Sequence, residues 1–285
     1  MATPARRPVH ARPREKYMSQ RRTFALVTGA SSGIGVVYAE RLAARGHDLI
    51  LVARRQDRLE TLAARLRETY GCRVEIHTAD LRYPDDLARI ETLVRDRDDI
   101  GVLVNNAGLG AGAPSVSADP DAVETLVKVN VLALTLLCLA ATPRFAARDE
   151  GLIINIGSVI AVIPSATAAA YSGSKAYVLN FSRSLQSEFS KTNVKVQLVM
   201  PGPVRTEFFG DRPPPFPDEL FMSPETLADI AFRALDQGEL VSWPTLHDWH
   251  LWTNFEDARR TLARAVSQDA VPPARYGLAV PAAVA

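Results

Sequence analysis

The sequence predicts an α/β fold, a doubly wound parallel sheet of about seven strands with helices on both faces. Strand-like apolar runs alternate with helix-length amphipathic segments along the chain. The apolar runs are nearly continuous, which is typical of strands covered on both faces. Such alternation gives right-handed crossovers and therefore parallel strands. The predicted strands are 23–28, 48–53, 73–78, 101–105, 152–157, 195–200 and 239–243, and the predicted helices are 33–45, 56–70, 84–97, 121–147, 171–190 and 223–237.

Length and composition favour one large domain. The chain has 285 residues, of which 47% are hydrophobic and 23% charged, so it can bury one sizeable core. Two small domains would also fit this length, but the Pro-rich segment 211–217 is too short to separate them. We therefore expect a flexible basic extension over 1–21, a single domain over 22–268 with a substrate lid near 207–222, and a tail over 269–285.

The N-terminal segment is strongly basic. Residues 1–22 contain seven Lys or Arg residues and one acid, whereas the whole chain has a net charge of only +1. The segment has no apolar run, so it does not resemble a signal peptide, and a short solvated extension is favoured over a nucleic-acid-binding arm. Alternatively, the fold begins with Met18, which opens the run MSQRRTFALVTG, and residues 1–17 are an upstream extension with no part in it.

Several function classes are disfavoured. The only two cysteines, Cys72 and Cys138, lie far apart, which suggests a reducing, cytoplasmic environment without a disulfide framework. His247 and His250 have no third ligand nearby, so no metal site is expected. Residues 151–174 carry no charge, but they include Asn, Ser and Pro residues that a lipid-facing span rarely holds together. A buried strand followed by an active-site loop is the better explanation, and neither a membrane nor a nucleic acid is an expected partner.

The first strand leads directly into a glycine cluster. The chain there reads Thr28-Gly29-Ala30-Ser31-Ser32-Gly33-Ile34-Gly35, and a helix is predicted to begin at Gly33. Glycines at such a junction allow a tight turn, let backbone N–H groups approach a pyrophosphate, and let the helix pack closely on the strand. The spacing is T-G-x-x-x-G-x-G, so a dinucleotide-binding turn is predicted.

With this octapeptide the chain resembles the single-domain form of the short-chain dehydrogenase/reductase family, which has a Rossmann fold. The resemblance covers roughly residues 22–245. Further matching elements follow in the family's order: Asp80-Leu81, Asn105-Asn106-Ala107-Gly108, Asn130, Ser158, Tyr171-x-x-x-Lys175 and Pro201-Gly202-Pro203-Val204-Arg205-Thr206. Each follows a predicted strand or lies in the helix after it, so chance is a poor explanation of the set.

The pair Tyr171 and Lys175 suits proton transfer. Residues four apart project from the same face of a helix. A tyrosine has an unperturbed pKa of about 10, so it needs a nearby cation to act near neutrality. Of the seven tyrosines, only Tyr171 has a lysine four residues later. The resemblance implies that Lys175 also holds the nicotinamide ribose, that Ser158 binds the substrate oxygen, and that Asn130 supports the helix and a proton-relay water.

Each of these residues also has an ordinary structural explanation. Ser158 could cap a loop, Lys175 could be a solvated helix lysine, and Asn130 could satisfy backbone groups. As an ordered set they favour the catalytic interpretation. The resemblance further implies cofactor contacts from Gly29, Ser31, Ser32, Gly33, Ile34, Gly35, Arg54, Arg55, Asp80, Leu81, Asn106, Ala107, Gly108, Tyr171, Lys175, Pro201, Gly202, Val204 and Thr206.

The end of the second strand favours NADP (NADPH) over NAD. NAD-binding versions of this fold place an acid there to accept from the ribose 2′-OH. Here Ala53 takes that position and Arg54 and Arg55 follow, which would attract a 2′-phosphate. A basic pair that merely precedes a helix is the alternative. Ser32 departs from one NADP pattern, in which a basic residue precedes the second glycine.

The substrate is predicted to be a hydrophobic ketone or aldehyde, or the corresponding alcohol. The run Val159 to Pro164 follows the catalytic serine, and the expected lid supplies aromatic residues, while Arg205 and Arg212 are the obvious charges nearby. Alternatively these apolar residues fill the core or an interface. The lid residues are Phe208, Phe209, Phe216, Leu220, Phe221 and Met222.

Two further expectations concern assembly and function class. The helix over 121–147 is apolar beyond one core stripe and resembles the family's subunit interface, so a homodimer or homotetramer is expected. Trp243, Trp249 and Trp252 could line either an interface or the pocket. The alternative function is a non-catalytic NADP-binding sensor or scaffold. Such a protein would usually lose part of the Ser-Tyr-Lys set, which is complete here. An epimerase would normally show a different glycine spacing and a larger substrate domain.

Overall fold

The computed structural model describes residues 22–110, 113–210, 216–268 and 270–277, with only the backbone described at Phe209. The predicted extension over 1–21, Arg212, and much of the predicted tail lie outside the described residues. The chain divides into two compact units, Met1–Pro244 and Thr245–Ala285. The first unit holds the sheet and every predicted catalytic and cofactor-binding residue.

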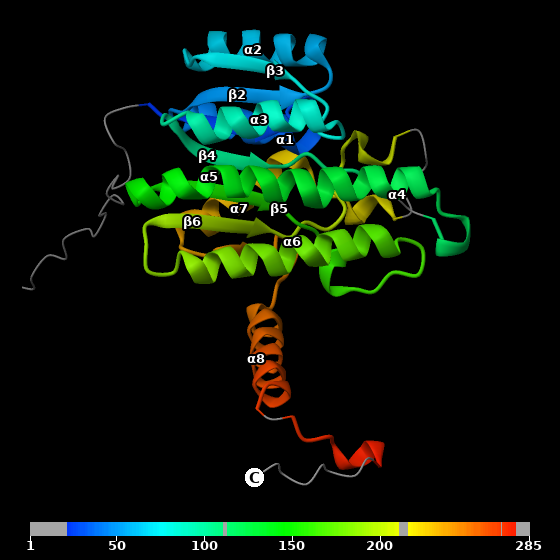
Figure 1. Ribbon diagram of the computed structural model, residues 1–285. Coiled ribbons are helices and arrows are strands. Elements are labelled where there is room, and N and C mark those ends of the chain that lie inside the picture. Colours follow the sequence, from blue (N-terminus) through cyan, green and yellow to red (C-terminus); the bar gives the residue numbers. More distant parts are fainter. Residues whose placement is uncertain (1–21, 111–112, 211–215, 269, 278–285) are drawn as a thin grey trace, which may run out of the picture. The chain divides into compact units, whose positions relative to one another are not determined.

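The sheet has seven strands in the order β3-β2-β1-β4-β5-β6-β7, and every pairing is parallel. The strand arrows accordingly point the same way in Figure 1. The strands are β1 (Phe24–Thr28), β2 (Asp48–Ala53), β3 (Val74–Thr78), β4 (Ile100–Asn105), β5 (Gly151–Ile156), β6 (Val194–Val199) and β7 (Val241–Ser242). All residues of β1 and β2 are buried, as expected for central strands covered on both faces. The predicted fold class is confirmed.

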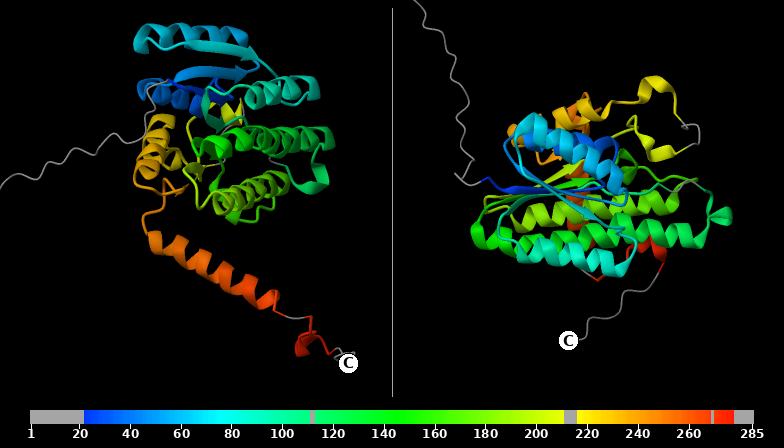
Figure 2. Two further views of the ribbon diagram at one scale, coloured as in Figure 1. Left: turned by 60° about the vertical axis from the view of Figure 1, so that its left-hand side comes forward. Right: turned by 90° about the horizontal axis from the view of Figure 1, so that it is seen from above.

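Helices cover both faces of the sheet (Figure 2, right). One layer contains α1 (Gly33–Ala44), α2 (Gln56–Tyr70) and α7 (Pro224–Asp236), with α1 packed against the other two. The other layer contains α3 (Pro84–Asp96), α4 (Pro120–Val127), α5 (Leu134–Arg148) and α6 (Ala169–Glu188), where α3 packs on α5 and α4 on α6. The buried side of the first layer is a single apolar core that includes the large side chains Tyr38, Leu59, Leu66 and Phe232.

Local sequence explains where these helices begin and end. Gly71 follows α2 in the left-handed conformation, with φ 59°, which glycine adopts without strain. Ser223 caps α7 by accepting a hydrogen bond from the Thr226 amide at 3.1 Å, and Pro224 occupies the first turn. The ends of α2 and α7 therefore lie within one residue of the ends that the sequence pattern predicts.

The structure differs from the predicted helix over 121–147. The helix starts at Pro120 and continues to Arg148, but a π-helical segment, η2 (Lys128–Ala133), separates α4 from α5. Insertions of this kind occur often at functional sites, and η2 contains Asn130. Among the described helices, the stretch Pro120–Arg148 is long and apolar enough to cross a membrane by length and composition alone, and half of its most apolar window is buried.

The second unit contains a helix that the alternation pattern did not predict. This helix, α8 (Trp249–Val266), is capped by Asp248, whose carboxylate accepts a hydrogen bond from the His250 amide at 3.0 Å. Within it, the rings of Trp252 and Phe255 stack with centroids 5.6 Å apart. The predicted strand at 239–243 is shorter in the structure, because only Val241 and Ser242 pair with β6.

Candidate active site

The strand order reverses direction between β1 and β4. The chain runs outward from β1 to β2 and β3, then returns to add β4 on the other side of β1. In open parallel sheets, ligands bind at this reversal, beyond the carboxyl ends of the strands. The turn after β1, Gly29 to Ser32, and the turn after β4, which begins at Asn106, both lie there.

The turn after β1 leaves little room for side chains. Gly29 and Gly33 have φ angles of 66° and 53°, which glycine adopts readily. A Cβ on Gly35 would lie 2.3 Å from the Gly29 carbonyl oxygen and 2.6 Å from the Asn106 amide nitrogen. Ser32 precedes α1 without a side-chain cap, so the first N–H groups of the helix remain open to an anion. This cradle fits the pyrophosphate of a dinucleotide.

Thr28 ties the two turns together. Its hydroxyl donates to the Val104 carbonyl at 3.1 Å and accepts from the amides of Asn106 and Ala107, both at 3.0 Å. The Asn106 side chain returns a hydrogen bond to the Thr28 carbonyl at 2.9 Å. Thr28 belongs to the glycine octapeptide but was not among the predicted site residues. Its signal was the polar residue at the end of an otherwise apolar strand.

The arginines after β2 differ in their surroundings. Arg55 donates to the hydroxyls of Ser31 at 3.0 Å and Ser32 at 2.8 Å, so it lies against the glycine turn. Arg54 is exposed, and its positive charge helps to lower the pKa of Asp80, which follows β3. Both arginines follow β2, where dinucleotide-binding folds place the adenosine ribose. Only Arg55 reaches the turn that would hold the phosphates.

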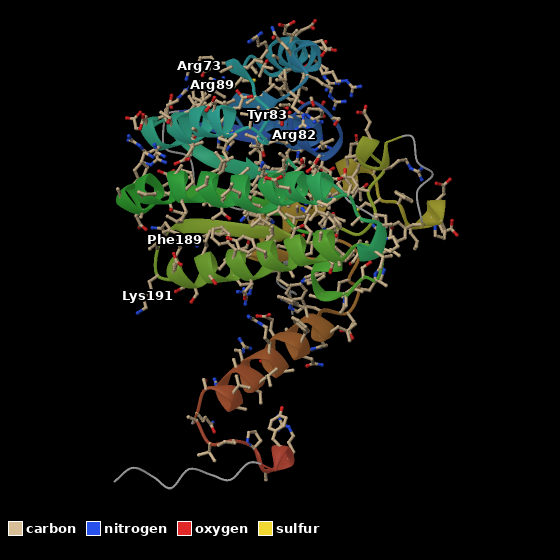
Figure 3. The ribbon with its side chains drawn as sticks, turned by 45° about the vertical axis from the view of Figure 1, so that its right-hand side comes forward. Arg73, Arg82, Tyr83, Arg89, Phe189 and Lys191 are labelled. Carbon is tan, nitrogen blue, oxygen red and sulfur yellow. The ribbon has the colours of Figure 1, made fainter. Side chains whose placement is uncertain are left out.

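Asp80 is held by its own loop. Burial alone would raise the pKa of this carboxyl, but hydrogen bonds and charge from Arg82 outweigh burial and lower it. Arg82 also lies over the ring of Tyr83, 5.5 Å from its centre (Figure 3). Leu81, in the same loop, is buried, so its backbone rather than its side chain is available to a ligand.

The other edge of the sheet is marked in Figure 3 by Phe189 and Lys191. They lie where α6 leads to the amino end of β6.

Ser158, Tyr171 and Lys175 converge beyond β5. Burial raises the pKa of Tyr171 to about 12, and the nearby Ser158 hydroxyl offsets part of this rise. Lys175 lies one turn later on α6 and is buried, so its pKa is lowered to about 8. Its ammonium donates to the Ile156 carbonyl at 2.8 Å.

Ser158 also has the ordinary structural role that its sequence position allows, because it caps the segment that follows it. Its hydroxyl oxygen accepts from the Ile160 amide at 3.3 Å and begins the short helix η3 (Val159–Val162). Ser172 on α6 donates to the carbonyls of Ile160 and Ile163, which fastens η3 beside the catalytic helix. Capping and substrate binding are therefore compatible, because the cap fixes Ser158 in place near the Tyr171 phenol.

Asn130 binds the turn after β4 rather than a catalytic side chain. Its amide oxygen accepts from the Leu109 N–H at 2.8 Å, and its amide nitrogen donates to the Leu109 carbonyl at 2.9 Å. The same nitrogen donates to the Ser174 hydroxyl at 3.2 Å. A Cβ placed on Gly108 would lie 3.5 Å from the Asn130 oxygen and 3.8 Å from the Lys175 nitrogen. Asn130 and Lys175 therefore flank the same glycine.

The segment after β6 closes the ring of predicted residues. Val204 pairs with Met222, and the Arg205 amide donates to the Met222 carbonyl at 2.9 Å, which ties together the two ends of the expected lid. Thr206 lies against Gly33, since a Cβ there would be 2.7 Å from its methyl group. The Phe208 ring is 5.8 Å from the Tyr171 ring. Pro201 is held to Ser158 through its carbonyl at 3.5 Å, and Gly202 follows it directly.

The residues present fit a bound NADP. The Gly35 cradle and the open end of α1 suit the pyrophosphate, and Arg55 carries positive charge beside them. Ile34 lies in the first turn of α1 and packs on the core, which leaves its backbone for the ligand. The structure thus brings together predicted residues from the ends of six strands, β1 to β6. The sequence pattern alone did not indicate the contact between Arg55 and the two serines.

The comparisons with known proteins agree with this geometry. The family model described as short chain dehydrogenase matches residues 23–214. The chain belongs to the short-chain dehydrogenase family. Relatives of this chain are named reductases and dehydrogenases.

Relatives within the short-chain dehydrogenase family differ in their named activities. A very-long-chain 3-oxoacyl-CoA reductase of Anas platyrhynchos is 34% identical over 193 residues, which cover 65% of this chain and 60% of the relative. An inactive hydroxysteroid dehydrogenase-like protein 1 of Homo sapiens is also 34% identical, over 64% of this chain and 56% of its own length. The chain therefore spans about three-fifths of the length of these curated relatives.

Solved family members match over nearly their whole length. A short-chain dehydrogenase from Sphingobium yanoikuyae in complex with NADPH is 42% identical, with a TM-score of 0.85, covering 89% of this chain and 100% of that one. A bulky-bulky ketone specific alcohol dehydrogenase from Comamonas testosteroni is 38% identical, with a TM-score of 0.82, covering 89% and 98%. NADP is thus a cofactor of related structures.

Proposed function

We propose that the chain catalyses NADPH-linked reduction of a hydrophobic ketone or aldehyde, or the reverse oxidation of the alcohol. The observation that carries this proposal is the convergence of Ser158, Tyr171 and Lys175 at the carboxyl end of β5. The bound nicotinamide would supply the hydride. The protein would orient the carbonyl and supply the proton.

In this proposal Tyr171 is the proton donor. Its raised pKa keeps the phenol protonated near neutral pH, so it is ready to donate to a carbonyl oxygen that gains negative charge. Ser158 would donate a second hydrogen bond to that oxygen, since its hydroxyl lies close enough to the Tyr171 phenol to lower the pKa of that phenol. Lys175 is a cation below its pKa of about 8, and its charge would favour the phenolate left behind.

NADPH is preferred over NADH in the same proposal. Ala53 removes the acid that would bind a ribose 2′-OH, and Arg55 offers a guanidinium beside Ser31 and Ser32. The relative in complex with NADPH supports this preference. Equal affinity of the unmutated chain for NADH and NADPH would contradict it.

The apolar character of the substrate rests on side chains near Tyr171. Phe208 lies against Tyr171, and Val162 and Ile163, just after Ser158, are 37% and 53% exposed. Exposed apolar groups of this kind gain about 25 cal/mol per Å² when a ligand covers them. The ketone-specific relative supports a bulky ketone more directly than a small sugar.

A panel of carbonyl substrates tests the proposal. NADPH consumption is measured by absorbance for a series of ketones of increasing apolar size, alongside hydrophilic keto sugars, with Tyr171→Phe as the matched inactive control. We expect kcat/KM to rise along the ketone series until steric exclusion. A flat or falling series together with good turnover of the sugars would reject the hydrophobic-substrate part.

The non-catalytic alternative makes the opposite prediction. A sensor or scaffold would bind NADPH but consume it at the same low rate in the unmutated chain and in Tyr171→Phe across the whole panel. The human relative that is named inactive supports this alternative. The complete Ser158, Tyr171 and Lys175 set is the feature that favours the enzyme.

We also propose that the protein is a cytoplasmic homo-oligomer. Leu132 and Leu139 are about half exposed on the long helix that resembles the family interface. Cys72 and Cys138 are both free and buried, which suits a reducing compartment. Light scattering after gel filtration tests the assembly, and Leu139→Glu should lower the measured mass if this face pairs.

A further inference from the structure

Glu207 forms ion pairs with two arginines that follow β2, where dinucleotide-binding folds place the adenosine ribose. One carboxylate oxygen accepts from Arg55 at 2.8 Å and from Arg58 at 2.8 Å, and the other accepts from Arg58 at 2.6 Å. Glu207 directly follows Thr206 and opens the short helix η4 (Glu207–Phe209). The arginines come from the end of β2 and the first turn of α2, about 150 residues earlier in the chain.

The Arg55 guanidinium joins three segments at one point. It meets Glu207 on one side and the hydroxyls of Ser31 and Ser32 on the other. In dinucleotide-binding folds, the end of the second strand faces the 2′-oxygen of the adenosine ribose. A carboxylate and a phosphate bind a guanidinium in the same forked geometry, so each can replace the other. Glu207 therefore occupies positive charge that a 2′-phosphate would need.

We propose that Glu207 is an internal competitor of the 2′-phosphate. Its carboxylate holds Arg55 and Arg58 in the cofactor-free chain, and the 2′-phosphate of NADPH displaces it and takes both arginines. This inference rests on the proposed NADPH function. It makes Glu207 a specificity-determining residue and Arg58 a second phosphate ligand, neither of which follows from the strand-end pattern.

The ion pairs are suited to exchange. The side chains of Arg55, Arg58 and Glu207 are 37%, 42% and 55% exposed. Exposed ion pairs contribute little net free energy, so a ligand with greater charge can displace the carboxylate. The carboxylate cannot stay beside the phosphate at little cost, because like charges in contact repel. A cofactor without the 2′-phosphate leaves the Glu207 pairs intact.

A charge-neutral variant separates competition from support. Glu207→Gln keeps the shape and one hydrogen-bond acceptor but removes the charge. If Glu207 competes, the variant binds adenosine 2′,5′-bisphosphate about three- to tenfold more tightly than the unmutated chain, which corresponds to the cost of breaking exposed ion pairs. If Glu207 only holds the arginines in place for the cofactor, the variant binds this ligand more weakly.

Calorimetry on the full chain measures these affinities without any turnover. Adenosine 5′-monophosphate, which lacks the 2′-phosphate, should bind the unmutated chain and Glu207→Gln with equal affinity. Asp218→Asn is the matched control, because Asp218 is an exposed acid of the same segment that pairs with Arg205 instead. It should leave the affinity for the bisphosphate unchanged.

A second variant tests Arg58. Arg58→Gln should weaken bisphosphate binding more in the Glu207→Gln background than in the unmutated chain. In the unmutated chain, loss of Arg58 also loosens the competing carboxylate, so the two effects partly cancel. Equal weakening in both backgrounds, or a bisphosphate affinity of Glu207→Gln at or below that of the unmutated chain, overturns the inference. If the unmutated chain instead binds the bisphosphate no more tightly than the monophosphate, the proposed NADPH preference itself fails.

Discussion

The ammonium of Lys175 lies 5.9 Å from the centre of the Tyr171 ring and is hydrogen-bonded to the Ile156 carbonyl. Burial acts on the two groups in opposite directions, since it lowers the pKa of Lys175 to about 8 and raises that of Tyr171 to about 12. Near neutral pH the lysine is therefore charged and the phenol protonated. This charge state favours proton donation, as reduction of a carbonyl requires.

Tyr171→Phe should keep the fold and NADPH binding but lower kcat on the best substrate by about 10²–10⁴ or more. The substitution removes only the hydroxyl that gives up the proton. Tyr177→Phe on the same helix is the control, because the Tyr177 hydroxyl bonds to Thr135 and its side chain is 39% exposed. Turnover by Tyr171→Phe within about tenfold of the unmutated chain would show that another group is the acid.

Lys175→Met should stabilise the cofactor-free chain at pH 7. The folded-state pKa of about 8 lies below the ordinary value of 10.5, so the buried charge disfavours folding below pH 8. Each pKa unit is worth about 1.4 kcal/mol, and loss of the bond to Ile156 offsets part of the gain, so we expect about 1–3 kcal/mol.

The stability gain of Lys175→Met should shrink as the pH rises. Between about pH 8 and 10.5 the unfolded chain binds more protons at Lys175 than the folded chain, so the stability of the unmutated protein rises relative to Lys175→Met. Urea unfolding at several pH values measures the difference. Lys191→Met, at the exposed end beyond α6 (Figure 3), is the control. A gain that is absent at pH 7, or constant through pH 10.5, would contradict the assignment.

The strand ends were the most predictable part of the site. Apolar periodicity located β1 to β6 within one residue, and parallel strands must bring their carboxyl ends to one edge. The contacts of Arg55 were not predictable, because they depend on how the segment after β6 folds back over the turn after β1. The helix α8 was missed because the prediction followed the alternation of strands and helices, and no described strand comes after α8.

Arg55→Gln should weaken NADPH binding about tenfold or more and leave NADH binding nearly unchanged. A charge-assisted hydrogen bond is worth about 1.5–3 kcal/mol, and Arg55 is the arginine that reaches the glycine turn. Arg54→Gln, at an exposed position, should have the smaller effect. Fluorescence titration with both cofactors measures this. A larger loss in Arg54→Gln would assign the 2′-phosphate to Arg54 instead.

Gly35→Ala should destabilise the fold and weaken cofactor binding. The added Cβ would lie 2.3 Å from the Gly29 carbonyl oxygen, so the turn after β1 must move. Overpacking of this kind costs about 1–3 kcal/mol. Gly173→Ala is the matched control, since Gly173 lies inside α6 with nothing within 4 Å of its Cβ position, and the change should stabilise the helix by about 0.5–1 kcal/mol. Thermal unfolding compares the two, and equal effects would argue against a tight cradle.

Asn130 is a positioning residue, and its replacement should mainly disturb the turn after β4. The π-helical segment places its amide where it bonds both the N–H and the carbonyl of Leu109, a result that no periodicity could predict. Asn130→Ala should cost about 1–3 kcal/mol, because these buried groups lose their partner.

The same variant should speed hydrogen exchange at the Leu109 amide and lower kcat more than it raises the KM for the ketone. Asn130→Asp keeps the acceptor for the Leu109 amide but loses the donors to the Leu109 carbonyl and to Ser174, so it should protect that amide and rescue activity only in part. Asn180→Ala, at an exposed position on α6, is the control for folding. If Asn130→Ala abolishes turnover while the Leu109 amide stays protected, Asn130 acts on the proton path itself and not through the turn.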